Sequence, residues 1–215
     1  MTATARTRRP PDEARGLILD AAAALLAQGG AAAVQVRAVA AQIGMTDAGV
    51  THHFGNRDKL LAELLRHGGR QLRAALQEVL AAWLDRGADL VELVESLERF
   101  YRRGYGELAA ALHAAGWRDR GGGILDPVAD ALHQLRPEGK SIDDTRLAVA
   151  ALHQAMATEA LYGSAFRRSA GLTGGAASDS TTQVRWWARQ LQLALGIEPT
   201  RQRRRPRRTD VRVSR

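Results

Sequence analysis

The sequence predicts an all-α protein, and three features of the whole chain support that fold class. Much of the chain is Ala, Leu, Arg, Gln and Glu, which are all good helix formers. Apolar residues recur at intervals of three and four, whereas the alternation typical of a β-strand is almost missing. Hydrophobic residues make up 45% of the 215 residues and charged residues 25%, so a packed core is expected.

The first predicted helix starts at the segment 10–12, because proline is tolerated in the first helical turn. Leu17, Ala21 and Leu25 then share one face of that helix. The glycine pair at 29–30 is expected to end it.

A second, short helix is predicted over Val36–Ile43, with Val39 and Ile43 facing inward. Gly44 follows it and suits a left-handed turn residue. Thr46 offers a hydroxyl N-cap to a third helix, in which Val50 and Phe54 are the inward pair. These two helices and their turn form one short unit.

Asn56 is predicted to cap a fourth helix that continues to about Leu84. Gly68 and Gly69 lie inside it, and each costs a helix interior about 1 kcal/mol relative to Ala. A kink or break is therefore expected there. The remaining helices are expected over Asp89–Trp117, broken or bent at its glycines, Ile124–Leu135, Asp143–Phe166 and Thr181–Leu195, with loops at Gly121–Gly123 and Gly171–Asp179.

The segment Gln35–Phe54 has the pattern of a helix-turn-helix. In such a motif two short helices cross steeply, so that one enters the major groove of DNA and the other braces it on the backbone. Ala40, Ala41 and Gly44 are small enough for a close crossing. The outward side of the third helix is polar and slender, and consists of Thr46, Asp47, Ala48, Thr51 and His52.

Three features extend this pattern over about residues 12–70. They are the run Ile18–Ala22, the turn Gly44–Thr46, and the pair His53–Phe54 followed by Asn56–Leu60. At this spacing the chain resembles the tetracycline-repressor (TetR) family. The resemblance implies an N-terminal three-helix helix-turn-helix DNA-binding domain over 12–70 and a C-terminal helical ligand-binding and dimerisation domain over 71–199. A basic tail over 200–215, expected to be disordered, follows.

The resemblance also implies roles for the matching positions. The outward residues of the third helix would face DNA, Val36 and Arg37 would lie at the phosphate-facing start of the second helix, and phosphate contacts would come from His53, Arg57 or Lys59. Arg57 could instead be a solvated charge. Asp47 departs from expectation because a carboxylate repels phosphate, although it can accept a hydrogen bond from cytosine N4. Thr51 and His52 stand where the family usually has aromatic residues.

The C-terminal helices suggest a homodimer and an effector pocket. A two-fold dimer reads a palindromic operator in double-stranded DNA, and helices 143–166 and 181–195 are the predicted dimer face, with plain core packing as the alternative. Trp186 and Trp187 are adjacent, so we expect one to pack inward and one to face outward. An unidentified small-molecule effector is expected to move the fourth helix, with Gly68 and Gly69 as a candidate hinge. The candidate pocket residues are Phe100, Tyr101, Tyr105, His113, Trp117, His153, Met156 and Tyr162, although core packing is the more usual role of such a residue taken singly.

Charge and missing motifs limit the other function classes. The net charge is +8, but residues 201–215 carry +7 and residues 1–10 carry +3, which leaves −2 for the rest. Without Cys, a phosphate-binding Gly loop or a Ser elbow, no enzyme, catalytic residue or cofactor is predicted. No metal site is expected either, since adjacent His52 and His53 point about 100° apart on a helix.

The sequence thus predicts a cytoplasmic DNA-binding transcriptional regulator with no membrane span. The polar, basic N-terminus contains no signal-peptide core. The predicted mode of action is a repressor that an effector releases. Two alternatives are a general DNA-associating protein driven by the Arg-rich tail, and a ligand-binding protein with degenerate DNA binding.

Overall fold

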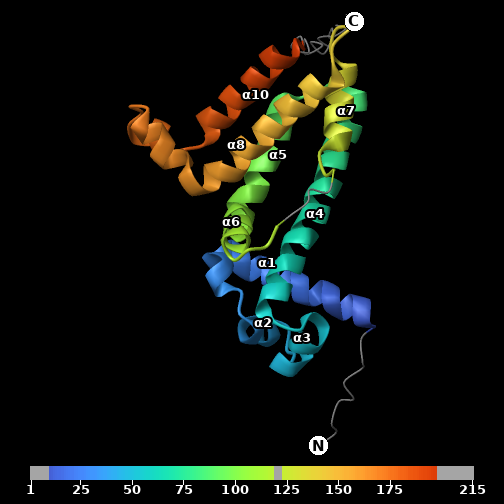
Figure 1. Cartoon of the computed structure of the whole chain (residues 1–215), viewed down its shortest axis with the longest axis vertical. Helices are drawn as coiled ribbons and strands as arrows, with labels where there is room; N and C mark the ends of the chain where they lie inside the picture. The colour runs from blue at the N-terminus through green and yellow to red at the C-terminus, as the bar shows by residue number, and fades with distance from the viewer. Residues whose placement is uncertain (1–9, 119–122, 198–215) are drawn as a thin grey trace, which may run out of the picture.

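Helix α4 connects the two ends of the molecule. The computed structural model describes residues 10–118 and 123–197, and every regular element in these ranges is helical. The N-terminal end consists of α1 (Pro11–Ala33), α2 (Val36–Gln42) and α3 (Asp47–Phe54), from which α4 (Arg57–Arg86) runs along the body (Figure 1). The body also contains α5 (Leu90–Phe100), η1 (Tyr101–Tyr105), α6 (Gly106–Ala114), α7 (Asp126–Gln134), α8 (Ile142–Ser169), α9 (Gly174–Ser178) and α10 (Thr181–Leu195).

The hydrophobic core is continuous from the N-terminal end into the body. Ile18 of α1, Leu64 of α4, Leu97 of α5 and Met156 of α8 are all fully buried members of it. α1 is the one helix in the described ranges whose length and hydropathy would allow it to cross a membrane. In this fold its buried face packs against α4 and η1 instead.

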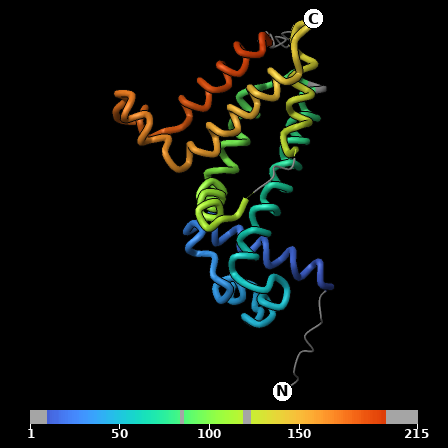
Figure 2. Tube along the Cα trace, viewed as in Figure 1, coloured from blue at the N-terminus to red at the C-terminus, as the bar shows by residue number. Residues whose placement is uncertain are grey.

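Helix α1 is interrupted at the predicted glycine pair. Gly29 and Gly30 both leave helical geometry, with φ = 64° at Gly30, and a last turn follows before α2. α5 and α6 are likewise separated, as their glycines predicted. The chain changes direction between α5 and α6 (Figure 2). The turn lies in η1 at Gly104 (φ = 93°), where an added Cβ would lie 2.9 Å from the backbone oxygen of Leu26. The turn therefore brings the body close to α1.

The prediction of a kink or break at Gly68 and Gly69 is wrong, because α4 is helical throughout Arg57–Arg86. The reason lies in packing. A Cβ on Gly68 would lie 2.1 Å from Cε1 of Tyr105, so the missing side chain makes room for that ring against the helix. The candidate hinge is therefore a point of close contact within a continuous helix.

One segment predicted as a loop, Gly171–Asp179, contains the short helix α9. Arg167 holds it in place, because its Nε donates a hydrogen bond to the carbonyl oxygen of Ala177 at 3.0 Å. The same buried guanidinium forms an ion pair with Glu159. These contacts come from α8, so the local composition of the segment did not indicate them.

Candidate functional site

The turn between α2 and α3 sets the direction of α3. Gly44 adopts φ = 67°, which is the left-handed conformation expected of it. Oγ1 of Thr46 then accepts a hydrogen bond from the backbone N–H of Gly49 at 3.1 Å, which caps the helix. Val50 and Phe54 are buried as predicted. The packed side and the outward side of α3 are thereby fixed.

The outward side of α3 is exposed to solvent at the end of the molecule (Figure 1). The residues that the sequence assigned to DNA contact, namely Thr46, Asp47, Ala48, Thr51 and His52, are all exposed there. On α2, Arg37 is exposed and Val36 is half-buried. The structure therefore brings these residues onto one accessible end of the molecule.

Arg15 of α1 secures the C-terminal end of α3. Its guanidinium lies 4.4 Å from the centre of the Phe54 ring, and its Nη1 donates a hydrogen bond to the carbonyl oxygen of His53 at 2.5 Å. Burial lowers the pKa of the half-buried His53, and the nearby charges of His52 and Arg15 lower it further. A neutral imidazole at pH 7 offers phosphate a hydrogen bond but no charge.

Arg57 and Lys59, the two predicted phosphate contacts on α4, have different surroundings. Nε of Arg57 donates to the carbonyl oxygen of Val34 at 2.8 Å and its Nη2 to that of Ala31 at 2.5 Å. The half-buried guanidinium thus ties the α1–α2 connection to α4, which neither of the two sequence interpretations included. The side chain of Lys59 is exposed. Its backbone N–H donates the capping hydrogen bond to Oδ1 of Asn56 at 2.9 Å.

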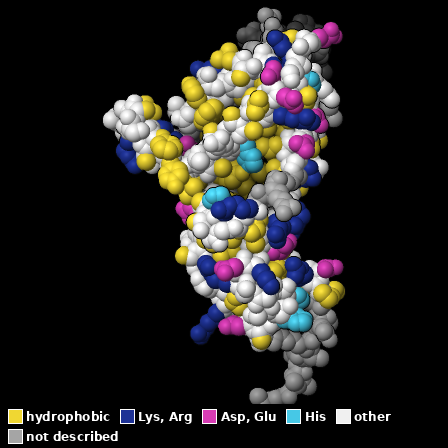
Figure 3. All heavy atoms as spheres, viewed as in Figure 1, with side chains coloured by type: hydrophobic (Ala, Val, Ile, Leu, Met, Phe, Trp, Pro, Cys, Tyr) yellow, Lys and Arg dark blue, Asp and Glu magenta, His cyan; other side chains and the backbone are white. Residues whose placement is uncertain are grey.

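A cavity of about 640 Å³ opens between α4, α5, α6 and α8. Figure 3 shows this hollow in the body, with hydrophobic side chains and a His within it and Lys or Arg side chains at its rim. Five of the predicted pocket residues line it, namely Phe100, Tyr101, His113, Trp117 and His153. Within this lining the hydroxyl of Tyr101 is hydrogen-bonded to Nε2 of His153, and burial lowers the pKa of His153.

The other three predicted pocket residues lie elsewhere, so those predictions are wrong. Tyr105 and Met156 are buried in the core, and Tyr162 is 52% exposed on the outer side of α8. Tyr162 follows His153 by nine residues, which is half a turn beyond two full turns and therefore the opposite side of the helix. Aromatic character alone did not distinguish these positions.

Four arginines that the sequence reasoning missed also line the cavity: Arg66, Arg70, Arg73 and Arg118. Three of them follow the i, i+4, i+7 spacing of one face of α4. That spacing was visible in the sequence. The spacing indicates a basic side of the cavity only because α4 is one continuous helix and that face of it lines the cavity.

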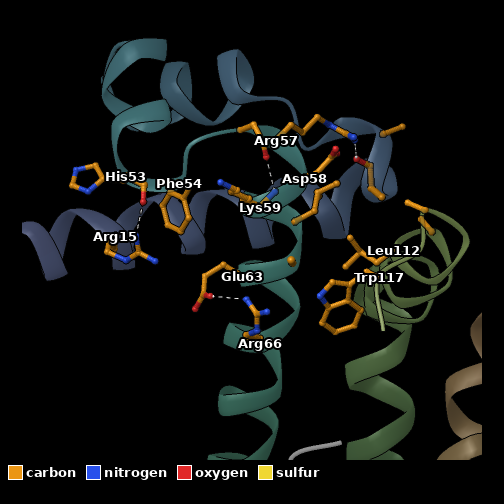
Figure 4. Close-up of a pocket in the computed structure, with 17 residues that line it drawn as sticks. Arg15, His53, Phe54, Arg57, Asp58, Lys59, Glu63, Arg66, Leu112 and Trp117 are labelled. Atoms are coloured by element: carbon orange, nitrogen blue, oxygen red, sulfur yellow. Dashed lines mark hydrogen bonds and ion pairs between the residues drawn. The ribbon is translucent and has the colours of Figure 1, made fainter. Parts of the chain in front are cut away.

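A second cleft, of about 650 Å³, separates the N-terminal end from α6. Figure 4 shows Arg15 directed toward His53 on one side of it and the paired Glu63 and Arg66 on α4. Arg66 and Trp117 line both this cleft and the larger cavity, with the guanidinium 6.0 Å from the indole centre. α4 therefore carries side chains that touch both spaces.

The helices α8 and α10 present an apolar surface to solvent. Its exposed members are Leu147, Tyr162, Phe166, Trp186 and Leu193. Trp187 packs against the core while Trp186 is exposed, as expected for adjacent residues. Among the described residues, no group of three or more His, Asp or Glu side chains could hold a metal ion. The predicted Arg-rich tail lies outside the described residues.

Comparison with known proteins gives consistent matches. Residues 18–64 match the model of the family described as bacterial regulatory proteins, tetR family. The HTH-type transcriptional repressor Rv3405c of Mycobacterium tuberculosis and the HTH-type transcriptional regulator Mb3439c of Mycobacterium bovis are each 33% identical over 153 residues, covering 69% of this chain and 73% of theirs. A crystal structure of the multidrug binding protein EbrR complexed with imidazole has a TM-score of 0.50 and 24% identity, covering 86% of this chain and 97% of that one, which concerns the fold alone.

Proposed function

The chain belongs to the TetR family of DNA-binding transcriptional regulators, and we propose that it is a homodimeric repressor that a small-molecule effector releases from its operator. The observation that carries this proposal is the outward side of α3, where every residue is exposed and slender. A surface of this kind, at the end of the molecule, can enter a major groove. The relative Rv3405c is itself named a repressor.

The contacts with DNA would come from the N-terminal unit, residues 12–70. Thr51 and His52 would reach base edges, and Asp47 would accept a hydrogen bond from cytosine N4. Lys59 and Arg37 are exposed cations that would neutralise phosphates. Arg57 is better explained as a structural residue, because two carbonyl oxygens already use its guanidinium.

The exposed apolar surface of α8 and α10 would form the dimer interface within residues 71–199. Leu193 and Leu147 are each 69% exposed, and contiguous exposed apolar surface often marks an association site. A two-fold dimer would present two copies of α3 to major grooves about 34 Å apart along the DNA. We therefore expect a palindromic operator, read in the cytoplasm.

Release would use the continuous helix α4. Its residues 65–73 line the cavity, and its N-terminal part follows α3 directly and packs against it. An effector can shift DNA binding only if it prefers one of the two arrangements of this helix. The side chains that line both the cavity and the cleft, Arg66 and Trp117, are the most direct route between them.

Selection of bound DNA from a random pool, followed by a salt titration, tests this function. The full chain should enrich one palindrome. The variant Thr51→Ala/His52→Ala should lose that preference, whereas Ala74→Ser/Gln77→Ala on the exposed side of α4 should keep it. Enrichment of no sequence by the full chain would contradict the proposal.

General DNA association is the second candidate, because residues 201–215 carry a charge of +7. Deleting them separates the two functions. A repressor should keep its sequence preference and lose only salt-sensitive background affinity, whereas a general binder should lose nearly all affinity.

A further inference from the structure

We propose that the cavity takes an amphipathic anion: an apolar, largely aromatic body that carries one carboxylate, sulfonate or phosphate-like group. This inference rests on the proposed function only in treating the cavity as an effector site. The chemistry of the ligand follows from the lining residues alone.

Among the described residues of the lining, the Arg, Lys, Asp and Glu side chains are all of one sign. Arg66, Arg70 and Arg73 project from one face of α4, and Arg118 follows α6. No Asp or Glu occurs among the described residues that line this cavity. A cationic ligand would be repelled here, and a neutral ligand would gain only hydrogen bonds from the four guanidinium groups, without the charge pairing that an anion gains.

The partners of these arginines leave positive charge uncompensated. Arg66 and Arg70 share a single carboxylate, that of Glu63, at 3.1 and 3.4 Å. Arg73 donates to the carbonyl oxygen of Gly123 at 2.8 Å, and Arg118 donates to the carbonyl oxygens of His113 and Trp117. Four cations thus face one anion among these contacts.

The arginines lie at the rim and the apolar groups lie deeper. The side chains of Arg66 and Arg70 are 53% and 60% exposed, so their guanidinium groups are accessible to water. Phe100, which lines the cavity, stacks on the core residue Tyr105 with ring centres 4.4 Å apart, and this contact holds the Phe100 ring in position. A ligand could therefore place its body against Phe100 and Trp117 and its anionic group among the guanidinium forks, whose geometry suits bidentate binding.

The carboxylate of Glu63 would compete with an anionic ligand for Arg66 and Arg70. It lines the cleft on the side of the DNA-binding unit, not the cavity. A bound anion would draw Arg66 and Arg70 away from Glu63. Removing that carboxylate should therefore tighten anion binding, which a merely structural role for the arginines would not produce.

The test compares two fluorescent probes with the same aromatic body. They are 8-anilinonaphthalene-1-sulfonate, an anion, and N-phenyl-1-naphthylamine, which lacks the sulfonate. The sulfonate probe should bind one site per subunit and at least about tenfold more tightly than the neutral probe.

Three variants test the cause of this difference in affinity. Arg70→Gln/Arg73→Gln should remove the difference, Arg70→Lys/Arg73→Lys should keep part of it, and Glu63→Gln should increase it. Arg99→Gln/Arg168→Gln, exposed arginines outside the cavity, is the matched control and should leave it unchanged.

Equal affinity for the two probes overturns the inference, as does sulfonate binding that is absent or insensitive to Arg70 and Arg73. Circular dichroism of each variant shows whether the fold is retained, and the Lys variant preserves the charge should the Gln variant unfold. Titrating the same probes into the complex with the selected DNA separates this inference from the proposed function. If the chain prefers the sulfonate probe through its arginines but binds no DNA, the ligand class is supported and the repressor function is contradicted. If it binds DNA but shows no preference for the sulfonate probe, the repressor function is supported and the ligand class is contradicted.

Discussion

Lys59 and Arg57 lie two residues apart in the first turn of α4, and we propose different roles for their cationic groups: phosphate contact for Lys59 and structural hydrogen bonding for Arg57. Lys59→Gln should reduce the slope of log affinity against log salt by about one for each subunit, because one phosphate contact is lost. Arg57→Gln should leave that slope unchanged and instead lower the free energy of unfolding by about 1–2 kcal/mol, since the carbonyl oxygens of Val34 and Ala31 lose their donor.

Salt-dependent DNA binding and urea unfolding of both variants measure the two effects. Asp58→Asn, an exposed neighbour between them, is the control for a general change of charge in this turn. A reduced salt slope in Arg57→Gln with unchanged stability would assign the phosphate contact to Arg57 instead.

His153 should make the protein less stable in mild acid. Burial lowers the pKa of its imidazole below the ordinary 6.5, so between these two pKa values the unfolded chain binds more protons than the folded one. The free energy of unfolding therefore rises with pH through this window and falls as the pH drops below 6.5. His153→Gln keeps an acceptor for the hydroxyl of Tyr101 and should flatten the curve.

Chemical unfolding of both proteins at a series of pH values, from about 8 down to about 5, tests this prediction. The difference between them isolates His153 from His53, whose pKa is also lowered. A difference that is constant over the whole series would contradict it.

At the residue scale, contacts within one turn of chain were predictable and distant contacts were not. Thr46 and Asn56 cap their helices through N–H groups three residues away, so residue type and position sufficed. The partners of Arg57 lie 23 and 26 residues away, and only the folded arrangement brings them together.

At the scale of elements, Gly68 should be intolerant of a substitution that normally favours helices. At an interior position, Ala usually makes a helix about 1 kcal/mol more stable than Gly does. At Gly68 the new Cβ would meet the Tyr105 ring at 2.1 Å, so Gly68→Ala should instead destabilise the protein by about 1–3 kcal/mol. Thermal and urea unfolding measure this.

Gly16 of α1 provides the matched control, because an added Cβ there meets nothing within 4 Å. Gly16→Ala should stabilise the protein by about 0.5–1 kcal/mol. In Tyr105→Ala the Gly68→Ala change should lose most of its cost, since the ring is gone. Equal effects of Gly68→Ala in both backgrounds would show that the contact with Tyr105 is not the cause.

Helices were predicted well where local pattern and packing agree, and less well where packing outweighs the pattern. The third helix, its cap and α10 follow from apolar spacing and turn residues. The glycines of α4 suggested a break because their local cost is unfavourable, but burial of neighbours such as Leu64 and Leu72 on both sides keeps the helix continuous.

At the scale of the whole molecule, α4 joins a surface shaped for DNA to a cavity in the body. The cavity required four separate helices and the segments around Trp117 and Ile124 to be placed together, so the sequence predicted a pocket and only part of its lining. The arginine stripe of α4 acquired meaning only from that placement. A resemblance confined to residues 12–70 indicates nothing about ligand chemistry.

In the proposed function, operator recognition depends most directly on the two-fold arrangement of two subunits. Leu147→Glu/Leu193→Glu would place charges at two positions that are each 69% exposed, so the fold of a single subunit should change in stability by less than about 0.5 kcal/mol each. Desolvating two carboxylates in an apolar interface is unfavourable, and the variant should therefore be monomeric in sedimentation velocity. Its affinity for a palindromic site should fall by at least about tenfold, while its affinity for a single half-site should be unchanged.

Ala75→Glu/Ala81→Glu is the control, because it adds the same charge on exposed positions of α4 and should affect neither sedimentation nor DNA affinity. A variant that still sediments as a dimer would locate the interface on another surface.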